Sequence, residues 1–95
     1  MDAKTANYEN RALIESGLKE LKRHWLKSFH TKAKIHVSEF LLEHWNLLYS
    51  TDEEKLADNK DMLEKNLAHM NDMPWSPWAQ GQGEALKEYL ANWKE

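Results

Sequence analysis

The feature that most constrains this fold is the near-absence of residues that interrupt helices. The chain of 95 residues contains only 3 glycines and 2 prolines, and no proline precedes Pro74. An all-β domain of this length would need a turn signal about every 10 residues, and the sequence does not supply them. A chain of this length also forms one hydrophobic core rather than two. We therefore expect an all-α fold in one helical domain that spans residues 1–95.

The first segment, residues 7–49, predicts one long helix. Its core-facing positions recur in steps of three and four, which is the spacing of one helix face. These positions are Ile14, Leu18, Leu21, Trp25, Phe29, Ala33, Val37, Phe40, His44 and Leu47 or Leu48. An unbroken helix would be about 63 Å long, which is unusual in a globular domain. The alternative is a break near His30, with Thr31 as the cap of a second helix. We favour a continuous or kinked helix because this place lacks glycine, proline and a capping box.

A second helix is expected from residues 50–54 to about Asn71. The sequence of residues 50–54, STDEE, contains two overlapping capping boxes, and its acidic side chains suit the first turn of a helix. Pro74 ends this helix, since a residue before proline avoids the helical conformation.

The third helix follows the only proline-containing stretch. Ser76 is predicted to be an N-cap, with Pro77 at the first helical position, where proline is favoured. The helix then runs to about Trp93. Because short connections make neighbouring helices antiparallel, the sequence predicts an antiparallel helical bundle of three helices, a long one and two shorter ones. If the first helix breaks near His30, the bundle has four segments instead.

The sequence carries no recognisable catalytic or metal-binding pattern. The absence of cysteine excludes disulfides, thiolate chemistry and sulfur-ligated zinc. There is no pair of Glu-x-x-His motifs, no His-Glu-x-x-His, no G-x-S-x-G and no phosphate-binding glycine loop. His36 and His44, which lie on or near the apolar face, are more typical of hydrogen-bonded or interface histidines than of metal ligands. We therefore expect no enzymatic activity, no metal and no cofactor.

The chain also lacks the hydrophobic segments that direct proteins into membranes or out of the cell. No apolar run approaches the roughly 20 residues of a membrane span. The first residues, MDAK, do not begin a basic region followed by an apolar stretch, as a secretory signal would. The expectation is a cytoplasmic protein without a membrane span.

Charge is unevenly distributed along the chain. Residues 11–34 contain seven bases against two acids, whereas residues 35–95 contain five bases against twelve acids. On the predicted first helix the bases form a ridge of Lys19, Lys22, Arg23, Lys27 and Lys34. Such a ridge can neutralise phosphates or lie on an anionic membrane surface. The uneven charge can equally mean that the basic part packs against the acidic part. Because the chain is acidic overall, with a net charge of −3, a nucleic-acid-binding regulator is kept as the alternative function.

Residues 37–49 are apolar almost all round the predicted helix. Only Glu39, Glu43 and Asn46 make a polar edge, and a helix segment of this kind is buried on most sides. One small hairpin does not cover it, so a second copy or another protein is the expected cover. The candidate partner-binding residues are Phe40, Leu41, Leu42, Trp45 and Leu48.

The chain also has five tryptophans, a residue type enriched at interface hot spots. Trp25, Trp78 and Trp93 fall on apolar helix faces, where core packing is expected. Trp75 and Trp78 flank the proline corner, which is either a plug over the bundle end or a second partner-binding patch. We therefore expect a small protein–protein interaction module, an adaptor, inhibitor or regulator, that self-associates through an apolar helix face.

Overall fold

The computed structural model describes residues 1–48 and 50–95, and over these residues the chain is all-α. Within these ranges the helices are four: α1 (Ala3–Lys22), α2 (Phe29–Glu43), α3 (Asp52–Asn71) and α4 (Pro77–Ala91). No strand occurs in the described ranges. The all-α bundle is confirmed, and its four-segment form is the one the chain adopts. Tyr49, at the end of the predicted first helix, lies outside the described residues.

The expectation of a continuous first helix is wrong, because α1 ends at Lys22 and α2 begins only at Phe29. The Ser28 hydroxyl accepts a hydrogen bond of 3.1 Å from the backbone N–H of Thr31, so Ser28 is the N-cap of α2 rather than Thr31. A serine cap suffices here without the acidic partner of a capping box. The break lets α2 fold back on α1 and bury apolar surface. A single helix of the predicted length, about 63 Å, would leave this surface in water.

The two later helix starts agree with the sequence analysis. Thr51 caps α3 through a hydrogen bond of 3.1 Å from the backbone N–H of Glu54. Ser76 caps α4 in the same way, with Pro77 as its first helical residue. Local side-chain chemistry thus fixes both starts.

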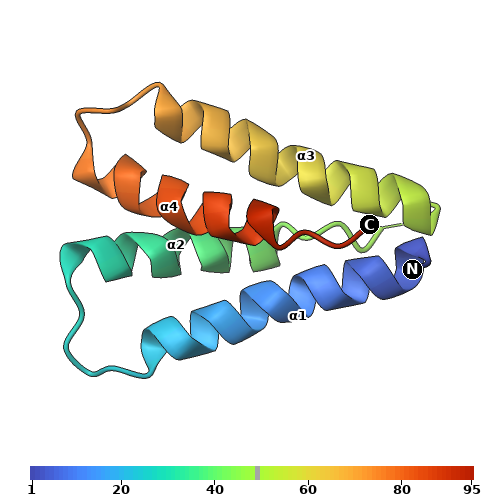
Figure 1. Ribbon diagram of the computed structural model, residues 1–95, viewed down its shortest axis with the longest axis horizontal. Helices are drawn as coiled ribbons and strands as arrows, with labels where there is room; N and C mark the ends of the chain where they lie inside the picture. Colours follow the sequence, from blue (N-terminus) through green and yellow to red (C-terminus); the bar gives the residue numbers. More distant parts are fainter. Residues whose placement is uncertain (49) are drawn as a thin grey trace.

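The helices form two antiparallel hairpins that pack side by side (Figure 1). Helix α1 packs against α2 and α3, and α4 packs against the same two helices, so α1 and α4 lie on one diagonal of the bundle. The connection from α2 to α3 follows the other diagonal and crosses the bundle end where both termini lie. The α1–α2 and α3–α4 loops lie at the opposite end, on its two sides.

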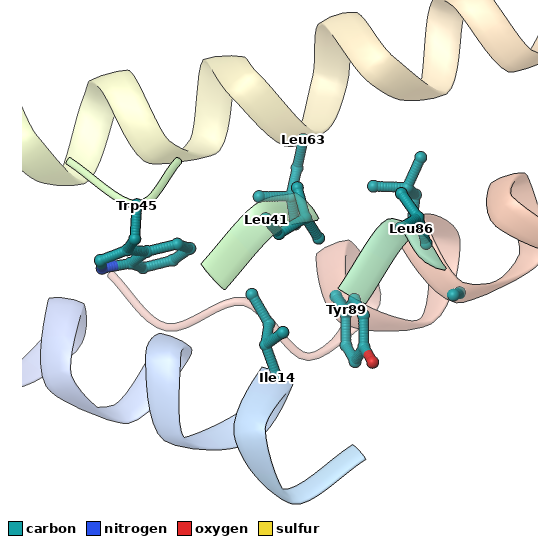
Figure 2. Packing of buried hydrophobic residues seen from close by; sticks show 8 residues of the cluster. Ile14, Leu41, Trp45, Leu63, Leu86 and Tyr89 are labelled. Atoms are coloured by element: carbon teal, nitrogen blue, oxygen red, sulfur yellow. The ribbon is translucent and has the colours of Figure 1, made fainter. Parts of the chain in front are cut away.

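The core draws on all four helices (Figure 2). Its buried members are Ile14, Val37, Leu41, Trp45, Leu63, Ala85, Leu86 and Tyr89. The Ser38 hydroxyl donates to the Lys34 carbonyl, so the Tyr89 hydroxyl donates to Ser38 across 2.7 Å. Burial raises the pKa of Tyr89, and the hydrogen bond with Ser38 offsets only part of that rise.

Two of the glycines allow close contact between helices. A Cβ atom at Gly81 would lie 2.8 Å from the Ala33 Cβ, so α2 and α4 approach each other there at a distance that only glycine permits. A Cβ atom at Gly17 would lie 2.9 Å from the Tyr89 hydroxyl. The sequence analysis offers no reason for these glycines, since close approach is a tertiary property.

Candidate functional site

Two of the predicted partner-binding residues belong to the core. Leu41 is 0% exposed and Trp45 is 6% exposed, and the Trp45 ring packs against that of Trp93 with centroids 6.0 Å apart. The prediction that Leu41 and Trp45 contact a partner is therefore corrected. Helix α2 ends before Trp45, so the helix face predicted for Trp45 on an unbroken helix does not apply. The backbone after α2 instead directs the Trp45 side chain into the core.

The rest of this group divides between core and surface. Leu42 is partly buried against the core. Phe40 and Leu48 are exposed, Leu48 by 75%. The Phe40 ring stacks on that of His44 with centroids 4.2 Å apart. Phe40 and Leu48 thus remain available to a partner, at two separate places.

The second predicted patch contains one packing residue and one exposed residue. Trp78 is partly buried, and its ring lies 5.1 Å from that of Phe29 and 5.5 Å from that of His36, between centroids. Trp75 is 76% exposed. Trp78 therefore packs between α4 and α2, while the indole of Trp75 is exposed to solvent.

The sequence analysis missed two exposed apolar residues, Trp25 and Leu26. They are 87% and 71% exposed, in the loop between α1 and α2. The analysis assigned Trp25 to the core because it continued the apolar spacing of a helix that in fact ends at Lys22. The signal that could have corrected this is Ser28, whose side chain favours a helix start shortly after Trp25.

We call the loop end of the bundle the aromatic end, because both loops there carry exposed apolar side chains. Its members are Trp25, Leu26, Phe29, Trp75 and Trp78. The two loops that carry the most exposed members lie at the same end of the bundle (Figure 1). Contact between Phe29 and Trp78 links the two sides of the aromatic end.

The predicted basic ridge does not form on a single helix. Lys19 and Lys22 belong to α1, Arg23 and Lys27 to the loop, and Lys34 to α2, which runs in the opposite direction. The prediction of a continuous basic ridge is therefore wrong, because it depended on an unbroken first helix.

Several of these bases already have partners. Lys22 lies 3.7 Å from Glu39, Arg23 lies 3.5 Å from Glu20, and Lys34 lies 3.7 Å from Glu84, between charged atoms. Lys27 donates to the backbone carbonyl of His24. Lys19 makes no ion pair or side-chain hydrogen bond with the described residues. These contacts hold much of the basic charge close to acidic side chains.

A small charged cluster joins α2 to α4 beside the aromatic end. The His30 ring donates to the Glu84 carboxylate, and Lys34 approaches the same carboxylate. The hydrogen bond from the His30 ring, aided by the nearby Lys34 ammonium group, lowers the pKa of Glu84. Glu84 therefore stays ionised and holds two basic groups in place.

Nothing in the described part of the chain places three or more histidine or acidic side chains around a possible metal position. Among the described helices, none combines the length and the apolar character needed to cross a membrane. No protein-family model, curated protein or solved structure matches the chain. A function is therefore argued from the surface itself.

Proposed function

We propose that this protein is a small interaction module that binds an acidic protein segment with its aromatic end. The observation that carries the proposal is the exposure of Trp25 and Trp75, at 87% and 76%, at the same end of the bundle. Large apolar side chains that gather on a surface mark interaction sites. Tryptophan in particular dominates the energy of protein–protein contacts.

Charge around the aromatic end supports an acidic partner. Residues 19–34 contain six bases and one acid, Glu20. The contacts with Glu39 and Glu84 reduce this excess without cancelling it. Complementary charge would guide such a partner to the surface, and the exposed indoles would supply most of the binding energy.

Nucleic-acid binding remains the alternative, with one supporting feature. Exposed aromatic rings beside bases also stack on single-stranded nucleic acids. Against it stand the ion pairs of Lys22, Arg23 and Lys34, which would have to be broken or shared with phosphates. Nucleic acids draw most of their affinity from contacts between bases and phosphates, whereas a protein segment draws on the exposed indoles, so partly neutralised bases weigh more against nucleic acid. We therefore favour a protein partner.

A counter-selected peptide screen tests the proposal. Random peptides would be selected on the wild-type protein and then counter-selected on the Trp25→Ser, Trp75→Ser double variant. We expect acidic peptides with aromatic or aliphatic anchors, whose affinity falls at least about tenfold in the double variant. Tyr8→Ser is the matched control, because Tyr8 is also 76% exposed but lies on α1 near the N-terminus.

Two outcomes would overturn the proposal. Peptides that bind the double variant as tightly as the wild type would place the site elsewhere. Tight, salt-sensitive binding of single-stranded oligonucleotides, with no peptide enriched, would establish the alternative function.

A further inference from the structure

The outer face of α2 is a second surface, which shares Phe29 with the aromatic end but lies outside the two loops that carry Trp25 and Trp75. Helix α2 packs against α1 and α4, which leaves its remaining side in solvent. At 3.6 residues per turn, the exposed residues of α2 share an arc of about 100°. They are Phe29, Lys32, His36, Glu39, Phe40 and Glu43. A shallow hollow of about 260 Å³ lies beside Phe40, bordered by His36, Glu39 and Glu43.

The charges on this outer face change sign along the helix. Lys32 lies in the N-terminal half of α2, and Glu39 and Glu43 lie in the C-terminal half. Within the described ranges, neither Lys32 nor Glu43 forms an ion pair. The face is thus complementary to the same face of a second, antiparallel copy, since that orientation brings a base of one helix opposite an acid of the other.

We propose that two copies of this chain pair through the outer faces of their α2 helices, antiparallel and about a two-fold axis. With the axis between residues 37 and 38, Lys32 lies opposite Glu43 of the second copy. His36 then lies opposite Glu39 of the second copy. Because a two-fold contact is self-complementary, each pair forms twice. The hollow beside Phe40 receives a side chain from the facing helix, as ridges pack into grooves between helices.

The order of charges distinguishes this arrangement from a parallel one. Parallel helices would bring Lys32 against Lys32 and Glu43 against Glu43, and like charges at a contact are unfavourable. A single helix pair buries less than the roughly 800 Å² per partner of a standard interface. We therefore expect reversible association in the micromolar range rather than a permanent dimer.

The antiparallel pairing has a functional consequence beyond binding one partner. It places the aromatic ends of the two copies at opposite ends of the dimer. The dimer then holds two acidic segments at once, which raises its overall affinity for a partner with two such segments. The dimer does not depend on that activity, because its charge pairs use residues outside the proposed binding loops.

Sedimentation velocity on the full chain, from low micromolar to millimolar concentration, tests the pairing. We expect the wild-type mass to rise from 11.3 kDa toward twice that value. Lys32→Glu and Glu43→Lys should each weaken association about tenfold, since each places like charges opposite one another twice. An equimolar mixture of the two variants should regain wild-type affinity, because opposite charges then face each other at both positions.

Lys4→Glu is the matched control, since Lys4 is exposed on α1. It should leave the association unchanged. A wild-type chain that stays monomeric overturns the proposal, as does a mixture of the two variants that associates no better than either alone. The Trp25→Ser, Trp75→Ser variant should dimerise normally, so failure of the proposed peptide binding and failure of this pairing give different results.

Discussion

The two ends of the bundle use the same kind of residue in opposite ways. At the end where the termini lie, Trp45 is 6% exposed and packs against Trp93. At the aromatic end, Trp25 and Trp75 are 87% and 76% exposed. Tryptophan content therefore does not indicate the core of this protein. The decisive difference is how firmly the surrounding backbone is held.

At the end with the termini, side-chain amides hold the irregular backbone. The Asn10 amide group donates to the Lys94 carbonyl across 2.9 Å and accepts from the Lys94 N–H across 2.7 Å. The Asn59 side chain accepts from the backbone N–H of Asn46 across 2.7 Å. These bonds fix the segments that carry Trp93 and Trp45, so both rings can pack in one position. Leu47 and Leu48 nevertheless remain exposed beyond them.

At the aromatic end, the hydrogen bonds of the loop backbone are local: besides the helix caps, Lys27 donates to the His24 carbonyl and Gln80 to the Pro74 carbonyl. Ser28 and Ser76 each cap the helix that follows, and Trp78 packs between those helices. The indoles of Trp25 and Trp75 lie outside this packing. The comparison predicts that substitutions at the terminal end change stability, whereas substitutions of the exposed indoles change binding.

The largest effect is expected from Trp45→Ala. Removing this buried ring should lower the free energy of unfolding by about 3–5 kcal/mol. Trp25→Ala, at an exposed position, should change it by less than about 0.5 kcal/mol. Urea denaturation followed by circular dichroism measures both. Equal losses in the two variants would break the distinction between the ends.

Asn10→Ala should have the next largest effect. It removes both hydrogen bonds to the Lys94 backbone, and leaving these groups without their partner costs about 2–3 kcal/mol. Hydrogen exchange should show lost protection at the Lys94 amide. Asn92→Ala is the control, because Asn92 is exposed and bonds only within its own helix end. Unchanged protection at Lys94 would show that the tail is held by packing alone.

Two glycines of α4 give a pair of opposite predictions. Gly81→Ala forces α2 and α4 apart near Ala33, and such overpacking costs about 1–3 kcal/mol. A Cβ atom at Gly83 meets its nearest neighbours only at 3.7 and 3.8 Å. Gly83→Ala should therefore stabilise the protein by about 0.5–1 kcal/mol through helix propensity. Thermal unfolding should move the midpoints of the two variants in opposite directions.

Among the variants chosen to weaken the fold, Ser28→Ala should show the smallest loss of stability. Loss of this cap should cost about 1 kcal/mol, whereas Ser16→Ala, on the exposed side of α1, should cost nothing because alanine has the higher helix propensity. Chemical denaturation of the two variants compares them. Equal stability of Ser28→Ala and the wild type would mean that packing, rather than the cap, determines where α2 begins.

The sequence determines the helix starts better than it determines the surfaces. Thr51, Ser76 and Pro77 carry local signals, and α3 and α4 begin where these signals indicate. The break before α2 depends on one serine cap, and its main cause is the burial gained when α2 folds back. That gain is a property of the assembled bundle.

The wrong expectation of an unbroken first helix also led to wrong predictions for candidate residues. Positions calculated on an unbroken helix placed Trp25 in the core and Trp45 on the surface, and both are reversed. Phe40, which the sequence analysis counted both on the core-facing side and among the partner-binding residues, is exposed, and so is Trp75, for which a plug and a contact surface were both left open. Residues in connections cannot be assigned to a face by helical spacing, and both reversed tryptophans lie in connections.

Both chain termini lie at the end opposite the aromatic end (Figure 1). A surface, a bead or another domain attached at either terminus would therefore hold the bundle by its far end and direct Trp25 and Trp75 outward. Attachment in this orientation leaves the indoles accessible without a long spacer. An attachment at a terminus and the proposed contact surface would therefore lie at opposite ends of the bundle.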